Sequence, residues 1–113
     1  MANSFVNKKV DLTTTSATTL YTVPDATTAI IKSILVSEDS GNADTITVTI
    51  TDTADAVFSL FKTKSISANG TTELLTAPLV LQQNEVLKVT AATANRLHVV
   101  LSALQSKPRE VIT

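Results

Sequence analysis

A run of strictly alternating residues between positions 45 and 51 constrains the fold of this chain more than any other feature. It reads Thr-Ile-Thr-Val-Thr-Ile-Thr, which places Ile46, Val48 and Ile50 on one side and four threonines on the other. Successive side chains of a β-strand point to opposite faces, so a period of two predicts a strand with one buried face. All seven residues are β-branched, and such side chains suit a pleated sheet. The segment therefore predicts a strand that covers an apolar core.

Eight further segments have the composition of strands, and short polar or proline-containing breaks separate most of them. Two of the breaks, Val23-Pro24-Asp25 and Asn69-Gly70, carry residues that favour tight turns. Nine short strands at this spacing predict an all-β fold in one domain: an antiparallel β-sandwich, jelly-roll-like, with eight or nine strands and extended terminal arms. Besides residues 45–51, the predicted strands are residues 5–12, 18–23, 30–36, 56–66, 72–76, 78–82, 86–92 and 96–104.

The size of the chain fits a single domain. Its 113 residues amount to 11.9 kDa, and a chain of that mass buries about 65% of its unfolded surface, which is enough for one core. We expect residues 1–12 to form an N-terminal arm and first strand, residues 13–104 the sandwich core, and residues 105–113 a C-terminal arm. Because both arms are mostly polar with apolar tips, we expect at least one of them to dock on a neighbouring subunit.

The chain has more apolar residues than the core of one small domain needs to bury. The run from residue 30 to 36 is apolar on both faces, which predicts a strand at the centre of a sheet or against another subunit. The apolar tips of the two predicted arms add to this surplus. The candidate protein-interface residues are Phe5, Val6, Ile31, Leu35, Val111 and Ile112.

Composition argues against several classes of function. Nine basic and ten acidic residues leave a net charge of −1, so we expect no nucleic-acid partner. The chain has no cysteine, which excludes disulfides and thiolate metal ligands. No apolar stretch approaches the ~20 residues of a membrane-spanning helix, and none resembles a signal peptide. We therefore expect no membrane partner and no cofactor.

The residues that carry chemistry are few and scattered. His98 is the only histidine, and it alternates with apolar neighbours in a predicted strand, which places it on the polar side of a sheet. No nucleophile motif accompanies it, so we expect no catalytic residue and no enzyme activity. Acidic residues near 38–44 and 52–55 form a possible Ca²⁺ site if their loops meet. A strand of about 20 Å separates these loops, and solvated turn carboxylates without a metal are the better interpretation.

Several stretches of the chain together resemble the pattern of a known class of proteins. In the first half they are Leu20-Tyr21-Thr22-Val23-Pro24 and residues 28–36 and 45–50, and in the second half they are residues 66–75, 78–81 and 85–89. This pattern resembles small virion structural proteins of tailed bacteriophages, particularly those of cyanobacterial and marine phages. The likeness covers residues 18–104 and contains strands and turns without a catalytic motif. Family members commonly have glycine after the first proline, where this chain has Asp25-Ala26.

The resemblance implies a β-sandwich that is made in the host bacterial cytoplasm and resides in the virion. The function that we favour is a capsid decoration (cement) protein, which is a homo-oligomer, preferably a trimer, bound to the major capsid protein or another virion protein. The alternative is a neck, tail or baseplate component, or a host-attachment module that binds glycans. A glycan binder needs exposed aromatic side chains, and only 4% of the residues are aromatic. A small enzyme or accessory domain is the weakest alternative.

Overall fold

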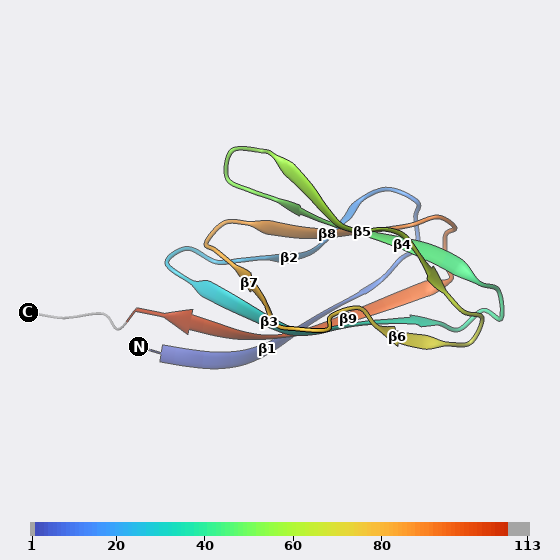
Figure 1. Cartoon of the computed structure of the whole chain (residues 1–113), viewed down its shortest axis with the longest axis horizontal. Coiled ribbons are helices and arrows are strands. Elements are labelled where there is room, and N and C mark those ends of the chain that lie inside the picture. The colour runs from blue at the N-terminus through green and yellow to red at the C-terminus, as the bar shows by residue number, and fades with distance from the viewer. Residues whose placement is uncertain (1, 109–113) are drawn as a thin grey trace, which may run out of the picture.

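The computed structural model describes residues 2–108 as two antiparallel β-sheets packed face to face (Figure 1). The larger sheet has the strand order β1-β9-β3-β6, with β7 also paired to β3, and the smaller has the order β2-β8-β4-β5. The predicted all-β antiparallel sandwich is therefore confirmed. The strands are β1 (Ala2–Asp11), β2 (Thr18–Thr22), β3 (Thr28–Glu38), β4 (Asp44–Thr51), β5 (Val57–Ile66), β6 (Thr71–Glu73), β7 (Leu79–Leu81), β8 (Val86–Ala91) and β9 (Leu97–Lys107).

The core lies between the inner faces of the two sheets. In β4 the side chains of Ile46, Val48 and Ile50 are buried, and the alternate threonines are only partly covered, as the sequence pattern predicts. β8 and β9 alternate in the same way. Because each sheet buries one face only, a period of two along these strands is enough to build a common apolar layer.

The order of the strands supports the jelly-roll-like part of the prediction. β6 pairs with residues 35–37 of β3 and β7 pairs with residues 29–31, so both short strands occupy one edge position beside β3. If they are counted as one interrupted strand, each sheet has four positions, in the orders 1-9-3-6/7 and 2-8-4-5. Each sheet thus takes strands from both halves of the chain, as two Greek keys do.

β3 lies at the centre of the larger sheet, which confirms a central strand over residues 30–36. In the pairing of β3 with β9, Ile31 lies opposite Ala103 and Ser33 lies opposite Ser102. Lys32 is therefore an extra residue in a β-bulge. The bulge shifts the alternation by one position. As a result Ile31 and Ile34, three residues apart, are both buried in the core.

The terminal segments pair with each other. β1 is paired with β9 along its whole length, and β9 continues to Lys107. Residues 2–11 of the expected N-terminal arm are thus an edge strand, and residues 105–107 of the expected C-terminal arm belong to β9. The division of the chain at residues 12 and 105 stays a prediction. Val111 and Ile112 lie outside the described residues.

Two further features differ from the simplest expectation. Asn69, with a φ of 56°, forms the predicted turn with Gly70, but this turn leads from β5 in one sheet to β6 in the other. β5 has two register shifts against β4, so Leu60 and Phe61 are neighbours that both pack against the core.

Residues 2–108 contain strands and no helix, and so no helix that is long and apolar enough to cross a membrane.

Candidate protein interface

Four apolar side chains form a row across the outer face of the larger sheet. Phe5 lies opposite Leu104, Leu104 lies opposite Ile30, and Ile30 lies opposite Val80. Directly paired residues share a face of a sheet, and the exposed fractions of 79% for Phe5 and 52% for Val80 identify this face as the outer one. We call these four residues the outer apolar row. It crosses β1, β9, β3 and β7, and it adds nothing to the core.

A second row on the same face is mixed in character. Val100 lies opposite both Lys9 and Leu35, and Leu35 lies opposite Glu73. Val100 and Leu35 are exposed, and a charged residue lies at each end of the row. The row between the outer apolar row and this mixed row is polar, with Ser102 at its centre. The outer face of the larger sheet thus combines apolar contacts with polar and charged groups, which is the composition of many protein interfaces.

The structure brings together only some of the residues predicted for an interface. Phe5 and Leu35 lie on this outer face. Val6 lies on the opposite face of β1 and packs at the margin of the core. Ile31 has no exposed surface, so it is not part of the surface that a partner could contact. Sequence reasoning missed Leu104, Ile30 and Val80 as interface residues, because their alignment with Phe5 depends on the pairing of strands distant in sequence.

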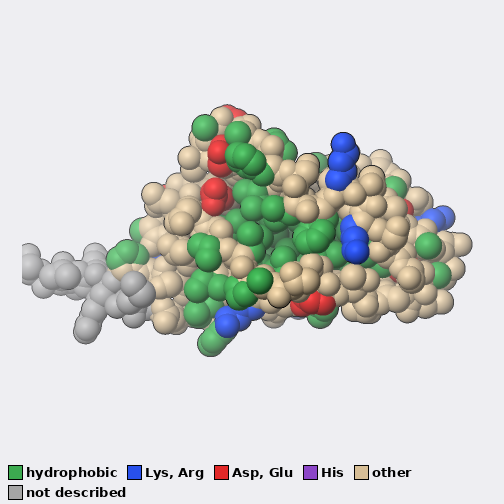
Figure 2. All heavy atoms as spheres, viewed as in Figure 1, with side chains coloured by type: hydrophobic (Ala, Val, Ile, Leu, Met, Phe, Trp, Pro, Cys, Tyr) green, Lys and Arg blue, Asp and Glu red, His purple; other side chains and the backbone are tan. Residues whose placement is uncertain are grey.

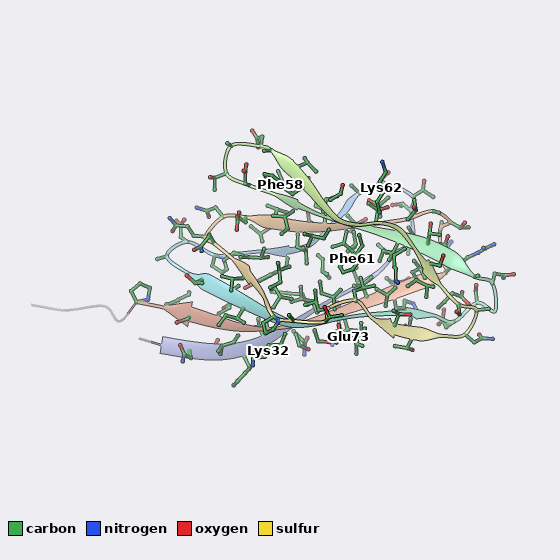
Figure 3. The ribbon with its side chains drawn as sticks, in the orientation of Figure 1. Lys32, Phe58, Phe61, Lys62 and Glu73 are labelled. Carbon is green, nitrogen blue, oxygen red and sulfur yellow. The ribbon has the colours of Figure 1, made fainter. Side chains whose placement is uncertain are left out.

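Glu73 holds the bulge of β3 in place beside this face. Its carboxylate accepts hydrogen bonds from the Ser33 hydroxyl, from the backbone N–H of Ile34 at 2.8 Å and from the backbone N–H of Leu75 at 3.2 Å. Desolvation raises the pKa of Glu73, but these hydrogen bonds outweigh it and lower the pKa below its usual value. The negative charge therefore persists at neutral pH. Figure 3 shows Glu73 and Lys32 on the larger sheet.

A groove of about 300 Å³ is a second apolar feature, at the open side of the sandwich. It lies between β5 and the segment that joins β6 to β7. Figure 2 shows hydrophobic side chains gathered in a band between the two sheets, and Figure 3 shows Phe61 directed into this space. Phe58 lies away from the groove, on the hairpin formed by β4 and β5, and is exposed. The residues that line the groove are Leu60, Phe61, Leu74, Leu75, Thr76, Ala77, Pro78 and Leu79.

The carboxylates expected to be solvated fall into two kinds. Glu38 and Asp44 are buried, so the expectation is wrong for these two. Asp44 accepts a hydrogen bond from the backbone N–H of Thr93 at 3.1 Å. Asp52 is partly exposed and accepts hydrogen bonds from the backbone N–H groups of the turn after β4. Glu38, Asp44 and Asp52 are thus all hydrogen-bond acceptors for loop backbone.

His98 lies at one end of the outer face, between two carboxylates. Its Nε2 is 3.2 Å from Oδ1 of Asp11, and its Nδ1 is 3.5 Å from Oδ2 of Asp39. All three side chains are well exposed to solvent, which confirms the polar side of the sheet predicted for His98. Over residues 2–108, no group of three or more histidine, cysteine, aspartate or glutamate side chains is arranged to hold a metal ion.

Comparison with known proteins finds similarity in structure and none in sequence. No protein-family model matches the chain, and no curated protein matches it. Among solved structures, the chain is similar to a chain of the Cyanophage Pam1 capsid asymmetric unit, at 17% sequence identity and a TM-score of 0.45. The match covers 94% of this chain and 85% of that chain.

Proposed function

We propose that this chain is a non-enzymatic structural protein of a tailed-phage virion, and specifically a capsid decoration protein that binds through the outer face of its larger sheet. The pattern of strands and turns over residues 18–104, which resembles that of such virion proteins, supports the class. The outer apolar row is the one observation that supports a binding role for this face. Under this proposal the major capsid protein, or another virion protein, is the partner.

The outer apolar row has the properties of a binding surface. Phe5 is almost fully exposed although it is a large aromatic side chain, and aromatic anchors contribute most of the binding energy in many interfaces. Burying one such side chain against a partner contributes about 1.5–3 kcal/mol. Single isolated apolar residues on a surface need no explanation, whereas a contiguous row in register across four strands does.

Several copies of this face in one oligomer would bind the head more tightly than a single copy. We propose that the protein acts as a homo-oligomer, with a trimer as the favoured state, so that several copies of the face engage the head together. Simultaneous binding at several sites raises the effective affinity through effective concentration, even when each contact is weak. This arrangement suits a protein that braces neighbouring capsid subunits in the virion.

A head-binding assay tests the proposal. Phage heads that lack the protein are incubated with the purified chain, and the bound fraction is measured by co-sedimentation. We expect Phe5→Ser combined with Val80→Ser to weaken binding at least about tenfold, which corresponds to a loss of about 1.4 kcal/mol or more. Because both side chains are exposed, the thermal midpoint of the free protein should change little.

A matched variant and a localisation experiment complete the test. Phe58→Ser changes an equally large exposed aromatic residue on the smaller sheet, and it should leave head binding unchanged. Equal binding by the Phe5/Val80 variant and the wild type would contradict the proposed face. A map of the virion that locates the protein only at the neck, tail or baseplate would replace the decoration role by the alternative.

A further inference from the structure

Three of the four sheet edges carry features that prevent strand pairing. β2 has five residues and a register irregularity between Thr19 and Tyr21. β5 has two register shifts and the exposed lysines Lys62 and Lys64. The edge beside β3 is divided between β6 and β7, with three residues each. Short strands, bulges and edge lysines are the devices by which proteins keep an edge from pairing with another chain.

β1 is the most regular of the four edges, and its two lysines, Lys8 and Lys9, lie together in its second half. It pairs with β9 over ten residues without a register shift, and its sequence contains neither proline nor glycine. Its other edge has no partner strand within residues 2–108. A long, regular edge presents a row of unpaired backbone donors and acceptors, which is a template for a further strand. The exposed Phe5 stands at this edge, at the end of the outer apolar row.

We infer that β1 is a homotypic docking edge, at which β1 of a second copy pairs antiparallel about a two-fold axis beside Phe5. The two larger sheets would then form one continuous sheet across the contact. This inference goes beyond the proposed function, because the contact forms between two copies in solution without any phage head. By itself it joins two copies, and in an assembly of trimers it links copies of adjacent trimers.

The apolar pattern selects the register of this pairing. With Phe5 opposite Phe5 of the second copy, the two outer apolar rows meet and become one row across both sheets. Asn3 then lies opposite Asn7 of the second copy, and residues 2–8 of both strands are paired. A register centred on Val6 places Phe5 opposite Asn7, and one centred on Asn7 places it opposite Lys9. Only the register centred on Phe5 keeps the apolar rows continuous.

Charge favours the same register. A contact centred on Lys8 or Lys9 opposes like charges across the two-fold axis, and directly opposed like charges destabilise a strand pair. In the register centred on Phe5, Lys8 lies opposite residue 2 and Lys9 lies beyond the paired residues. The Lys8 ammonium is also 6.0 Å from the centre of the Tyr21 ring, within the range of a cation–π contact. The side chain thus extends toward the smaller sheet, away from Phe5.

Cysteine cross-linking tests the contact, because the chain has no cysteine of its own. Opposed residues of antiparallel strands have Cα atoms about 4.5–5.5 Å apart, which falls within the span of about 4.4–6.8 Å that a disulfide needs. Phe5→Cys should therefore form a disulfide-linked dimer under mild oxidation. Asn3→Cys and Asn7→Cys should each remain monomeric on a non-reducing gel, and a mixture of the two should cross-link. This mixed pair keeps Phe5 in place.

The cross-linking experiment has a control variant and two results that would contradict the inference. The control variant is Val57→Cys. Val57 is 62% exposed on β5, so a cysteine at this position reports cross-linking by random collision. If Phe5→Cys and the Asn3→Cys/Asn7→Cys mixture cross-link no more than Val57→Cys, the inference is wrong. A cross-linked mixture of Phe5→Cys with Asn7→Cys, without the other products, would overturn it as well, because it indicates a different register. None of these results depends on head binding, so the proposed function stands or fails separately.

Discussion

The carboxylate of Glu38 at the end of β3 accepts a hydrogen bond from the backbone N–H of Asn69, 31 residues later in the chain, at 3.0 Å. The same oxygen accepts a second bond from the backbone N–H of Gly41 at 3.0 Å. The other oxygen accepts bonds from the backbone N–H of Ser40 at 2.8 Å and from its hydroxyl group. One buried carboxylate therefore joins the loop that follows β3 to the turn that precedes β6.

These bonds predict a pH-dependent contribution of Glu38 to stability. Desolvation by burial raises its pKa, but the bonds from Ser40, Asn69 and Gly41 outweigh it and lower the pKa from 4.5 to about 2. Because the pKa is lower in the folded state, this contribution is present above the unfolded-state pKa and is lost as pH falls from about 4.5 toward about 2. Glu38→Gln should therefore lower the thermal midpoint at pH 7, and the difference from wild type should shrink over that range.

Asp39→Asn is the matched control for this measurement. It changes the adjacent, exposed carboxylate, and its thermal midpoint should stay close to that of the wild type at pH 7. Thermal melts followed by circular dichroism at several pH values would compare the three proteins. A difference between Glu38→Gln and wild type that is constant from pH 7 to pH 2 would show that the charge of Glu38 is not the cause.

Two neighbouring residues of β3 allow the core and the outer face to be compared directly. Ile34 is completely buried and Leu35 is 40% exposed on the outer face. Ile34→Ala should lower the free energy of unfolding by about 2–5 kcal/mol, because it leaves a cavity in the core. Leu35→Ala should cost about 1 kcal/mol or less. Urea denaturation measures both, and similar losses for the two variants would contradict the assignment of the faces.

His98 provides a test of the prediction that this histidine has no role in the function of the protein. Its contacts are the exposed carboxylates of Asp11 and Asp39, and exposed ion pairs contribute about 1 kcal/mol or less. We expect His98→Ala to retain head binding within about twofold, a change of about 0.4 kcal/mol. If a stably folded His98→Ala protein lost head binding, this histidine would belong to the functional surface after all.

Removal of residues 109–113 tests the predicted role of the C-terminal arm. We expect the shortened chain to bind heads or assemble more weakly, with a nearly unchanged thermal midpoint, since the strand pairs of β9 remain. A cut before Ser106 should behave differently, because Ser106 pairs with both Asn3 and Thr28. Calorimetry of both truncations separates these effects. A large fall of the midpoint on removal of residues 109–113 alone would place that segment in the core of the same chain.

Local patterns in the sequence were enough to predict the strands. The alternation at residues 45–51 and the apolar run at residues 30–36 depend on which side chains fit a pleated strand, and the structure has strands at both places. The turn at Asn69, whose φ is positive, follows from the tolerance of asparagine for this conformation. Each of these properties belongs to a few consecutive residues, so neither the strand order nor a partner sheet is needed to recognise it.

The tertiary structure alone decided which of these residues share a surface. Phe5 and Leu104 are adjacent because β1 pairs with β9, almost the whole length of the chain away. The bulges in β3 and β5 moved side chains from one face to the other, and Glu38 became buried because two distant loops close over it. Such contacts depend on the register between strands that are remote in sequence, and a shift of one residue in register exchanges the two faces. The alternating pattern thus determined that each strand has a buried and an exposed face, and strand pairing determined which exposed residues form one row.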